Sequence, residues 1–226
     1  GLSWYFKGVY DSAAVYYYKS LEIAKKVKNL SVKAGVLNEL GKLYRKTRDL
    51  DRSLQMYNEA YEIYKKLNNE SEMATILNES GVVFEYKEDF AEAINRYKSS
   101  LAIREKLKDE VGIAYSYNFL GGVYTIQKKF KEAEDYLIKS LELRKKLKDS
   151  FAIALSYSDL GYMYKEQADY TRAADQYNLS NILAEKMRYA ELLQANFREL
   201  AAIAEKTGNF ALSLEYYKKQ AALKDS

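Results

Sequence analysis

The sequence contains no cysteine, no proline and no histidine. Without cysteine there is neither a disulfide framework nor a thiolate metal site. Without cysteine and histidine, the usual strong nucleophile and the usual general base are both missing, which argues against catalysis. No Gly-rich phosphate loop occurs either, because Gly121-Gly122 falls within a predicted helix and lacks the Lys and Ser or Thr that follow in such loops. We therefore expect a protein that is not an enzyme and that has no cofactor.

Charge and hydropathy argue against two further classes. Lys and Arg number 36 against 32 Asp and Glu, and this small excess does not predict nucleic-acid binding by this fragment. No apolar run approaches the roughly 18 residues of a membrane span, and no signal peptide is visible. Since the chain opens with Gly1-Leu2 and has no initiator Met, we interpret it as a fragment.

What the sequence does contain is one segment repeated at a fixed interval. An aromatic residue or Leu is followed by Asn or Ser, any residue, Leu or Ser, and Gly, with an aromatic residue three positions later. The glycines of this motif are spaced 40 residues apart: Gly41, Gly81, Gly121 and Gly161. A fixed period argues for one continuous array.

Each period carries two amphipathic helical patterns. Small and large residues recur at helical spacing after each glycine, as in Ser53, Tyr57 and Ala60. Small residues let two helices approach, and large ones fill the gap between them. Since no proline occurs, no helix is broken internally. Residues that can cap the second helix precede it in four repeats: Asp49, Asp89, Asp169 and Asn209.

This pattern resembles that of the tetratricopeptide repeat (TPR) family, whose signature is Trp-x2-Leu-Gly-x2-Tyr followed by Ala-x3-Phe. Here it reads Leu37-x2-Leu40-Gly41-x2-Tyr44 followed by Ser53-x3-Tyr57. Two features depart from the family: the proline near the repeat end is missing, and the period is 40 residues instead of about 34. Because the turn inside the repeat has its ordinary spacing, we expect each helix to be about one turn longer. Such repeats are similar to those of kinesin light chains and bacterial peptide-pheromone receptors.

The resemblance implies an all-α fold, a right-handed TPR superhelical solenoid of antiparallel helix pairs. We predict a single solenoid over residues 1–226, with a truncated repeat at 1–30, full repeats at 31–70, 71–110, 111–150 and 151–190, and a weaker sixth repeat at 191–226. In this register Gly1 aligns with Gly41. Residues 1–8 would therefore form the end of a first helix, and a second helix would follow around Ala13.

Neither end of the array has a polar capping helix, although solenoids normally need one. We therefore expect exposed apolar side chains at both ends: Leu2, Trp4, Tyr5 and Phe6 at the first, and Leu214, Tyr217 and Leu223 at the last. Self-association through these ends would cover them.

Tyrosine is abundant, with 23 residues. Seven tyrosines occupy signature positions, where we expect them to pack between helices and not to stack on a ligand: Tyr44, Tyr57, Tyr97, Tyr124, Tyr164, Tyr177 and Tyr217. Residues 16–18 are three consecutive tyrosines, which cannot all face inward on one helix.

In TPR arrays the first helix of each repeat lines a concave groove, and the residue three positions before each motif glycine points into it. This column reads Asn38, Asn78, Asn118, Ser158 and Arg198. A carboxamide has one acceptor and two donors, so a ladder of them can hold the backbone of an extended peptide. The resemblance to kinesin light chains and pheromone receptors implies this role. The alternative is that the amides bond to a neighbouring helix or to water.

Neighbouring groove positions are further candidate peptide contacts: Lys42, Arg45, Tyr115 and Tyr162. The two basic residues suit an acidic segment of a peptide lying against the second repeat. The expected function is a non-enzymatic scaffold that binds a peptide or protein segment in this groove.

Two alternative functions stay open. The last residues, ending in Leu223-Lys224-Asp225-Ser226, resemble the final repeat of TPR sensor regions in Bacteroidetes-type regulators. This resemblance implies the periplasmic input domain of a membrane-anchored signalling regulator, and the absence of cysteine suits an oxidising compartment, so a periplasmic location is favoured over a cytoplasmic one. The other alternative is a scaffold that self-associates through its uncapped ends.

Overall fold

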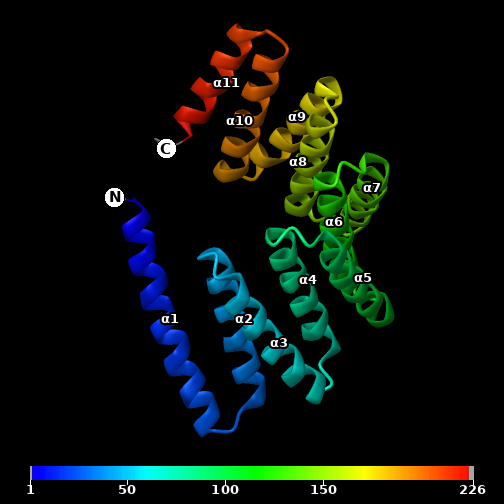
Figure 1. Ribbon diagram of the computed structural model, residues 1–226. Coiled ribbons are helices and arrows are strands. Elements are labelled where there is room, and N and C mark those ends of the chain that lie inside the picture. The colour runs from blue at the N-terminus through cyan, green and yellow to red at the C-terminus, as the bar shows by residue number, and fades with distance from the viewer. Residues whose placement is uncertain (1, 224–226) are drawn as a thin grey trace. The chain divides into compact units, whose positions relative to one another are not determined.

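The computed structural model describes the backbone of residues 2–223 and the side chains of residues 13–223. All secondary structure in this range is α-helical, and within each of the two units defined below successive helices form antiparallel hairpins (Figure 1). The helices are α1 (Leu2–Lys26), α2 (Leu30–Lys46), α3 (Leu50–Lys66), α4 (Glu70–Tyr86), α5 (Phe90–Leu107), α6 (Glu110–Ile126), α7 (Phe130–Lys146), α8 (Ser150–Glu166), α9 (Tyr170–Lys186), α10 (Ala190–Lys206) and α11 (Phe210–Ala222). They divide into two compact units, Gly1–Asp109 and Glu110–Ser226.

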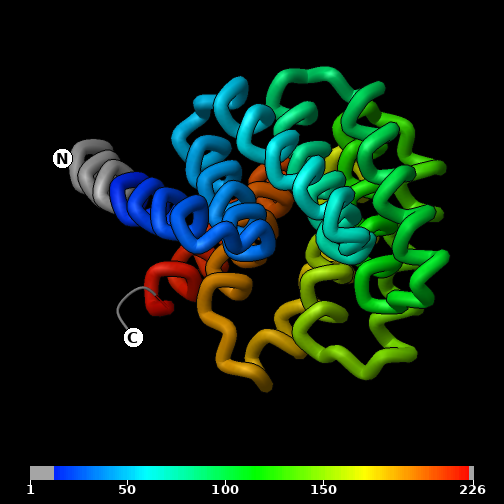
Figure 2. Tube along the Cα trace, turned by 90° about the horizontal axis from the view of Figure 1, so that it is seen from below, coloured from blue at the N-terminus to red at the C-terminus, as the bar shows by residue number. Residues whose placement is uncertain are grey.

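The 40-residue period consists of two long helices and two short turns. Helices α2 to α4 and α6 to α10 are each 17 residues long. Most of the turns between them have three residues (Figure 2). The residues that exceed the usual TPR period therefore lie in the helices and not in a loop, as the spacing predicts. Within the described part of the chain, every helix is too short or too polar to cross a membrane.

The turns share one backbone geometry. Every twentieth residue from Lys28 (φ 53°) to Gly208 (φ 77°) adopts a left-handed conformation, and only the last of these is a glycine. Asn or Asp side chains then accept a backbone N–H of the following helix, which stabilises a helix start by about 1 kcal/mol. The capping residues are Asn29, Asp49, Asn69, Asp89, Asp149, Asp169 and Asn209. The predicted caps of the second helices are thus confirmed.

The two helices of each repeat pack through the motif glycine. In the first unit, a Cβ atom built on Gly41 would lie 2.5 Å from the ring of Tyr57, and one on Gly81 would overlap the ring of Tyr97. In the second unit, Gly121 faces Leu137 and Gly161 faces Tyr177 in the same way. These large side chains are completely or almost completely buried. The glycine register predicted from the sequence is therefore correct.

Most of the signature tyrosines pack as expected. Tyr57, Tyr97, Tyr164 and Tyr177 are buried, and Tyr44 and Tyr124 are half-buried. For Tyr217 the packing expectation is wrong and the expectation of exposure at the end of the array is confirmed, because its side chain is exposed on α11, where no further helix among the described residues covers it.

The start of the chain differs from the prediction. Residues 2–26 form one continuous helix, α1, without the predicted turn near Gly8. At most of the other turns an Asp or Asn after the left-handed residue caps the new helix, whereas Val9 has no side-chain oxygen that could do so. The side chains of Leu2, Trp4, Tyr5 and Phe6 lie outside the described residues. Among residues 16–18, Tyr17 packs on the core of the first unit and its two neighbours are exposed.

At the other end, Leu214 is exposed on α11, as predicted. Leu223 is not, because it packs against the core of the second unit. Its carbonyl group accepts a hydrogen bond from Gln194 Nε2 on α10 at 2.9 Å. The last turn of α11 is thus held on α10, and this part of the predicted exposed end is wrong.

Candidate functional site

Within each unit, the first helices of successive repeats contact one another directly. In the first unit α2 contacts α4, and in the second unit α6 contacts α8 and α8 contacts α10. We call the surface formed by these helices the groove face of each unit. The predicted site residues all lie on these first helices.

In the first unit, the predicted column begins with Asn38 on α2 and continues with Asn78 on α4. Both side chains are buried. Asn38 is 7% exposed, and its Oδ1 atom is enclosed without a hydrogen-bond partner among the described residues. Buried polar side chains are almost always hydrogen-bonded, so the carboxamide of Asn38 is an unusual feature of this face.

The basic residues of the first unit already have acidic partners. Lys42 Nζ lies 2.8 Å from Glu39, and Arg45 Nη2 lies 3.1 Å from Glu79 on the next first helix. The hydroxyl group of Tyr57 also donates to Glu79, at 3.3 Å. The acidic group expected opposite Arg45 is therefore supplied by the chain itself.

The first unit also holds a half-buried acidic side chain beside a tyrosine. The hydroxyl of Tyr97 donates to Glu85 Oε1 at 2.6 Å. Burial raises the pKa of the Glu85 carboxyl, and the hydrogen bond from Tyr97 opposes this rise only in part. Glu85 is a groove-face position at which the other repeats carry Arg45, Thr125, Lys165 and Glu205.

In the second unit, two members of the predicted column bond within the protein. Asn118 Oδ1 accepts a hydrogen bond from Arg144 Nη1 at 3.3 Å, and its side chain also hydrogen-bonds to Asp159. Ser158 Oγ donates to Asn196 Oδ1 on α10 at 2.8 Å. Both contacts join neighbouring helices, as the alternative interpretation of the column expects.

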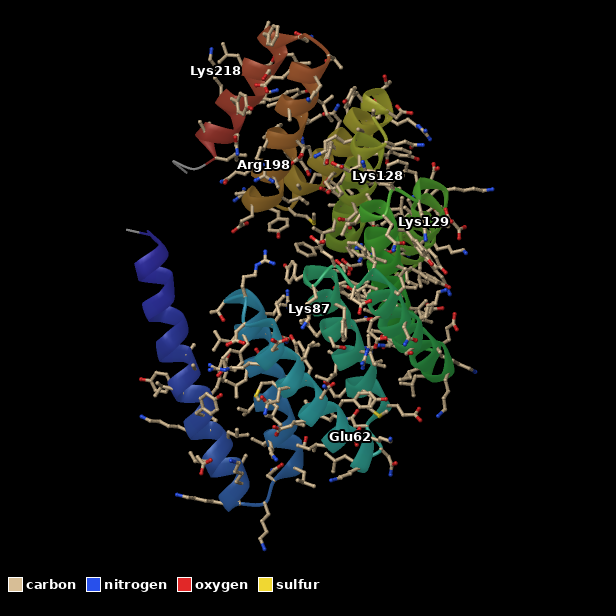
Figure 3. All side chains as sticks on the ribbon, viewed as in Figure 1. Glu62, Lys87, Lys128, Lys129, Arg198 and Lys218 are labelled. Atoms are coloured by element: carbon tan, nitrogen blue, oxygen red, sulfur yellow. The ribbon has the colours of Figure 1, made fainter. Side chains whose placement is uncertain are left out.

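The last member of the column, Arg198, has an exposed side chain on α10 (Figure 3). It forms an ion pair with the adjacent Glu199 at 3.1 Å. Glu199 also binds Lys165 Nζ at 2.8 Å, so it links α8 to α10. Among the members of the column, Arg198 is the most accessible to a ligand.

A buried arginine lies beneath this column. Arg144, near the end of α7, is 4% exposed and donates through Nη1 to Ser156 Oγ at 2.6 Å and to the carbonyl of Ala152 at 3.1 Å. Burial lowers the pKa of its guanidinium. Burial likewise raises the pKa of the Asp159 carboxyl, against the opposing effects of Asn118 and the Arg144 charge. Asn118 thus joins a buried guanidinium to a half-buried carboxyl.

Tyr115 and Tyr162 are exposed aromatic residues on the groove face of the second unit, with 45% and 43% of their surface accessible. Each has a cation on one side of its ring. The guanidinium carbon of Arg144 lies 5.3 Å from the ring centre of Tyr115, and Lys165 Nζ lies 4.8 Å from that of Tyr162. Exposed rings held in place in this way are suitable contacts for a ligand.

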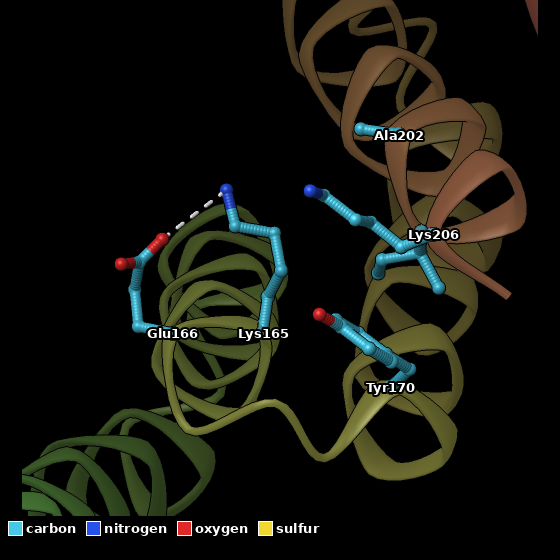
Figure 4. A pocket seen from close by; sticks show the side chains of 6 residues that line it. Lys165, Glu166, Tyr170, Ala202 and Lys206 are labelled. Atoms are coloured by element: carbon cyan, nitrogen blue, oxygen red, sulfur yellow. Dashed lines mark ion pairs between the residues drawn. The ribbon is translucent and has the colours of Figure 1, made fainter.

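A cavity of about 270 Å³ lies between α8 and α10. The ammonium groups of Lys165 and Lys206 and the hydroxyl of Tyr170 point into the same space (Figure 4). Burial disfavours the charge of Lys165, but Glu199 and Glu166 outweigh that effect and raise its pKa. Lys165 is therefore charged and already paired, which makes this cavity a weak site for an additional anion.

Sequence reasoning missed Arg144, Asp159 and Glu79, which hold the groove-face residues in place. At the register of Arg144 the other repeats carry Ala24, Tyr64, Arg104 and Ala184. A charged residue at a position that is small or aromatic in three other repeats is a signal of a buried polar contact. Its partners, however, lie on two other helices and cannot be identified from this signal.

The chain belongs to the tetratricopeptide repeat family. The family matches residues 5–66, 32–106 and 112–180. No curated protein matches the chain.

Solved structures with the same fold include several TPR arrays. BtubC (BKLC) from P. vanneervenii has a TM-score of 0.80 and 19% identity, over 96% of this chain and 91% of that one. A Rap protein complexed with Competence and Sporulation Factor has a TM-score of 0.76 and 19% identity, over 85% of this chain and 54% of that one. A STAND ATPase with a tetratricopeptide repeat sensor from Pyrococcus horikoshii has a TM-score of 0.69 and 18% identity, over 96% of this chain and 36% of that one. Identities this low show a shared fold, and the chain spans only part of the last two proteins.

Proposed function

We propose that this protein is a non-enzymatic TPR scaffold that binds an extended peptide or protein segment on its groove face. Membership of the TPR family supports a scaffold, since TPR proteins typically bind other proteins without catalysis. The Rap protein with a similar fold is complexed with Competence and Sporulation Factor. For the present chain, the proposal depends on the contacts of its own groove-face residues.

The observation that carries the proposal is the carboxamide of Asn38. Its Oδ1 atom is enclosed and accepts no hydrogen bond from a described residue, and the residue as a whole is only 7% exposed. A buried acceptor without a partner costs about 1–3 kcal/mol, so Asn38 Oδ1 needs a donor from outside the described residues, supplied either by water or by a ligand. The backbone N–H and C=O groups of an extended peptide supply both an acceptor and a donor for this carboxamide.

The remaining residues of the proposed site fall into two groups. Tyr115, Tyr162 and Arg198 are accessible and are proposed to contact the ligand directly. Asn118 and Ser158 bond to neighbouring helices and are proposed to position the groove-face helices. Three further residues of the first unit, which lie on the groove face near Asn38, complete the proposed site: Lys42, Arg45 and Asn78.

The experiment is to select binders from a random peptide library and to measure their affinity for Asn38→Ala by fluorescence polarisation. The control is Asn58→Ala, because Asn58 is exposed on α3, a second helix that does not form the groove face. Loss of one or two hydrogen bonds should weaken binding by about 2-fold to 10-fold in Asn38→Ala. Asn58→Ala should bind like the wild type. Asn118→Ala is less informative because it also removes the link between Arg144 and Asp159.

Two results would contradict the proposal. One is that no peptide from the library binds the folded protein. The other is that Asn38→Ala and Asn58→Ala bind the selected peptides equally well, which would place the peptide elsewhere.

A second candidate function, self-association, is favoured by one specific observation. Helix α11 exposes Phe210 (71%), Leu214 (56%) and Tyr217 (40%), and no helix among the described residues covers that face. Apolar patches of this kind commonly mark contacts. Light scattering over a wide range of protein concentration should show association that Leu214→Lys abolishes. Ile182→Lys, on an exposed position of α9, is the control. A wild-type protein that stays monomeric throughout would contradict this candidate.

A further inference from the structure

The guanidinium of Arg144 has one edge that the protein does not use. All its hydrogen bonds start from Nη1, which donates to Asn118, Ala152 and Ser156. Nε and Nη2 have no hydrogen-bond partner among the described residues. Both nitrogens retain some accessible surface, since neither is among the enclosed side-chain atoms that lack a partner. This edge carries two parallel N–H donors, the arrangement that binds a carboxylate through both of its oxygens.

Comparison with the preceding repeat shows why this edge is open. Arg104 occupies the same register, and its Nη1 binds Asp109 at 2.5 Å while its Nη2 donates to Thr75 Oγ1 at 2.7 Å. At the position of Thr75, the next repeat has Tyr115. Its ring lies against the guanidinium of Arg144. Among the described residues, Arg144 donates its hydrogen bonds to other groups and not to Tyr115.

The second partner has also changed its role. Asp149 occupies the register of Asp109, but its Oδ1 accepts the backbone N–H of Ala152 at 3.0 Å and caps α8. Among the described residues Arg144 forms no ion pair with Asp149, whereas Arg104 forms one with Asp109. Neither position that supplies Asp109 and Thr75 to Arg104 supplies a hydrogen-bond partner to Arg144, although Nε of Arg104 also lacks a partner among the described residues.

Arg144 lines a cavity of about 170 Å³ between α6, α7 and α8, all in the second unit. Its other walls include Val111, Ala114, Tyr115, Leu147 and Asp149. At about 30 Å³ for each water-sized group, this volume has room for roughly five such groups. It therefore fits a carboxylate on a short aliphatic stem and is too small for a folded partner.

We propose that this cavity binds the carboxylate of an acidic ligand, held by the Nε–Nη2 edge of Arg144 and covered by the ring of Tyr115. The inference rests on the proposed function in one respect: the bound carboxylate is expected to come from a peptide that lies on the groove face. A free small carboxylic acid is the other source of the same chemistry. With a single cation in the cavity, a monoanion is better matched than a phosphate dianion.

Asp149 limits the affinity of this site. Its carboxylate lines the same cavity and repels an anion there. Asp149→Asn keeps a side-chain oxygen that can cap α8, so it removes the charge without removing the cap. This substitution should therefore strengthen carboxylate binding without unfolding the helix.

The test follows the side-chain Nε–H signals of arginine in the ¹⁵N-labelled full chain during titration with sodium acetate. Sodium chloride at equal ionic strength and neutral acetamide serve as control titrations. The Arg144 signal is assigned by its loss in Arg144→Lys, and Arg104→Lys identifies the matched control signal. Acetate should shift the Arg144 signal with saturation and leave the Arg104 signal unchanged. The acetate concentration at half-maximal shift (the midpoint) should fall by about threefold or more in Asp149→Asn and should rise in Tyr115→Ala.

The proposal is overturned if acetate moves the Arg144 signal no more than chloride does, or if Asp149→Asn leaves the midpoint unchanged. If Arg144→Lys does not fold, the midpoint in Asp149→Asn is read from the arginine Nε–H signal that saturates with acetate and not with chloride in the wild type. A capped pentapeptide with a central Glu, compared with its Gln counterpart, then distinguishes the two sources of the carboxylate. Tighter binding of the Glu peptide than of acetate identifies a peptide, and equal binding identifies a free acid.

Failure of this proposal can be told apart from failure of the proposed function. Library peptides that bind through Asn38 while acetate leaves Arg144 unchanged would refute the carboxylate site alone. Saturable binding of acetate without any library peptide on the groove face would refute the proposed peptide binding alone.

Discussion

Adding one methyl group at Gly121 should destabilise the protein, whereas adding one at Gly122 should not. A Cβ atom on Gly121 would lie 2.6 Å from Leu137 Cγ and 3.3 Å from the carbonyl oxygen of Ala133. A Cβ atom on Gly122 meets no atom within 4 Å. The two glycines are neighbours in the same helix, α6, so the pair forms a matched comparison.

The magnitude follows from the geometry. Carbon atoms pack at about 3.5–4.0 Å, so Leu137 would have to retreat by roughly 1 Å in Gly121→Ala. The atom in the way is the branch point of a buried side chain and not a flexible end, and overpacking of this kind costs about 1–3 kcal/mol. Replacing Gly by Ala within a helix gains about 1 kcal/mol in both variants. The difference in free energy of unfolding between the variants should therefore be about 1–3 kcal/mol, with Gly122→Ala at least as stable as the wild type.

Urea unfolding followed by circular dichroism measures both variants under the same conditions. A double-mutant cycle then tests the cause, because Leu137→Ala opens space next to Gly121. In that background Gly121→Ala should become as harmless as Gly122→Ala. Equal stability of the two single variants would refute the packing register. A penalty for Gly121→Ala that persists in the Leu137→Ala background would show that Leu137 is not its cause.

Two further predictions concern charge and capping. Because burial raises the pKa of Glu85, the folded state holds its proton more tightly than the unfolded state, and this residue should lower stability as the pH rises above about 4.5. The Glu85→Gln variant can still accept the hydrogen bond from Tyr97, and it should lose this decline of stability with pH. The measurement is the free energy of unfolding from about pH 4 to 7. If the free energy of Glu85→Gln falls with pH as steeply as that of the wild type, the prediction is wrong. Lys129 precedes α7 without a side-chain cap, so Lys129→Asp should add about 0.5–1 kcal/mol and raise the melting temperature, and no gain would mean that the helix start is satisfied in another way.

The candidate site was only partly predictable from the sequence. The column from Asn38 to Arg198 lies on the first helices as the repeat register predicts. Asn38 and Asn118 occupy the same register and look equivalent in the sequence. In the structure, however, Asn38 Oδ1 accepts no hydrogen bond from a described residue, while Asn118 joins Arg144 to Asp159. The difference arises because the partners of Asn118 come from α7 and α8, and a single-helix pattern carries no information about them.

The sequence by itself determined the features that depend on local spacing. Helix length follows from the interval between the motif glycines, and the helix ends follow from the capping residues at the turns. The packing register follows from the alternation of small and large residues. Each of these features depends on residues that are close together in the chain. Only the tertiary structure decided that α1 continues through Gly8, that Leu223 folds onto the core, and that Arg144 turns toward α8 while Arg104 binds Asp109. These outcomes depend on which polar groups meet between helices, and the cost of burying a charge without a partner selects among arrangements that the repeat pattern leaves equivalent.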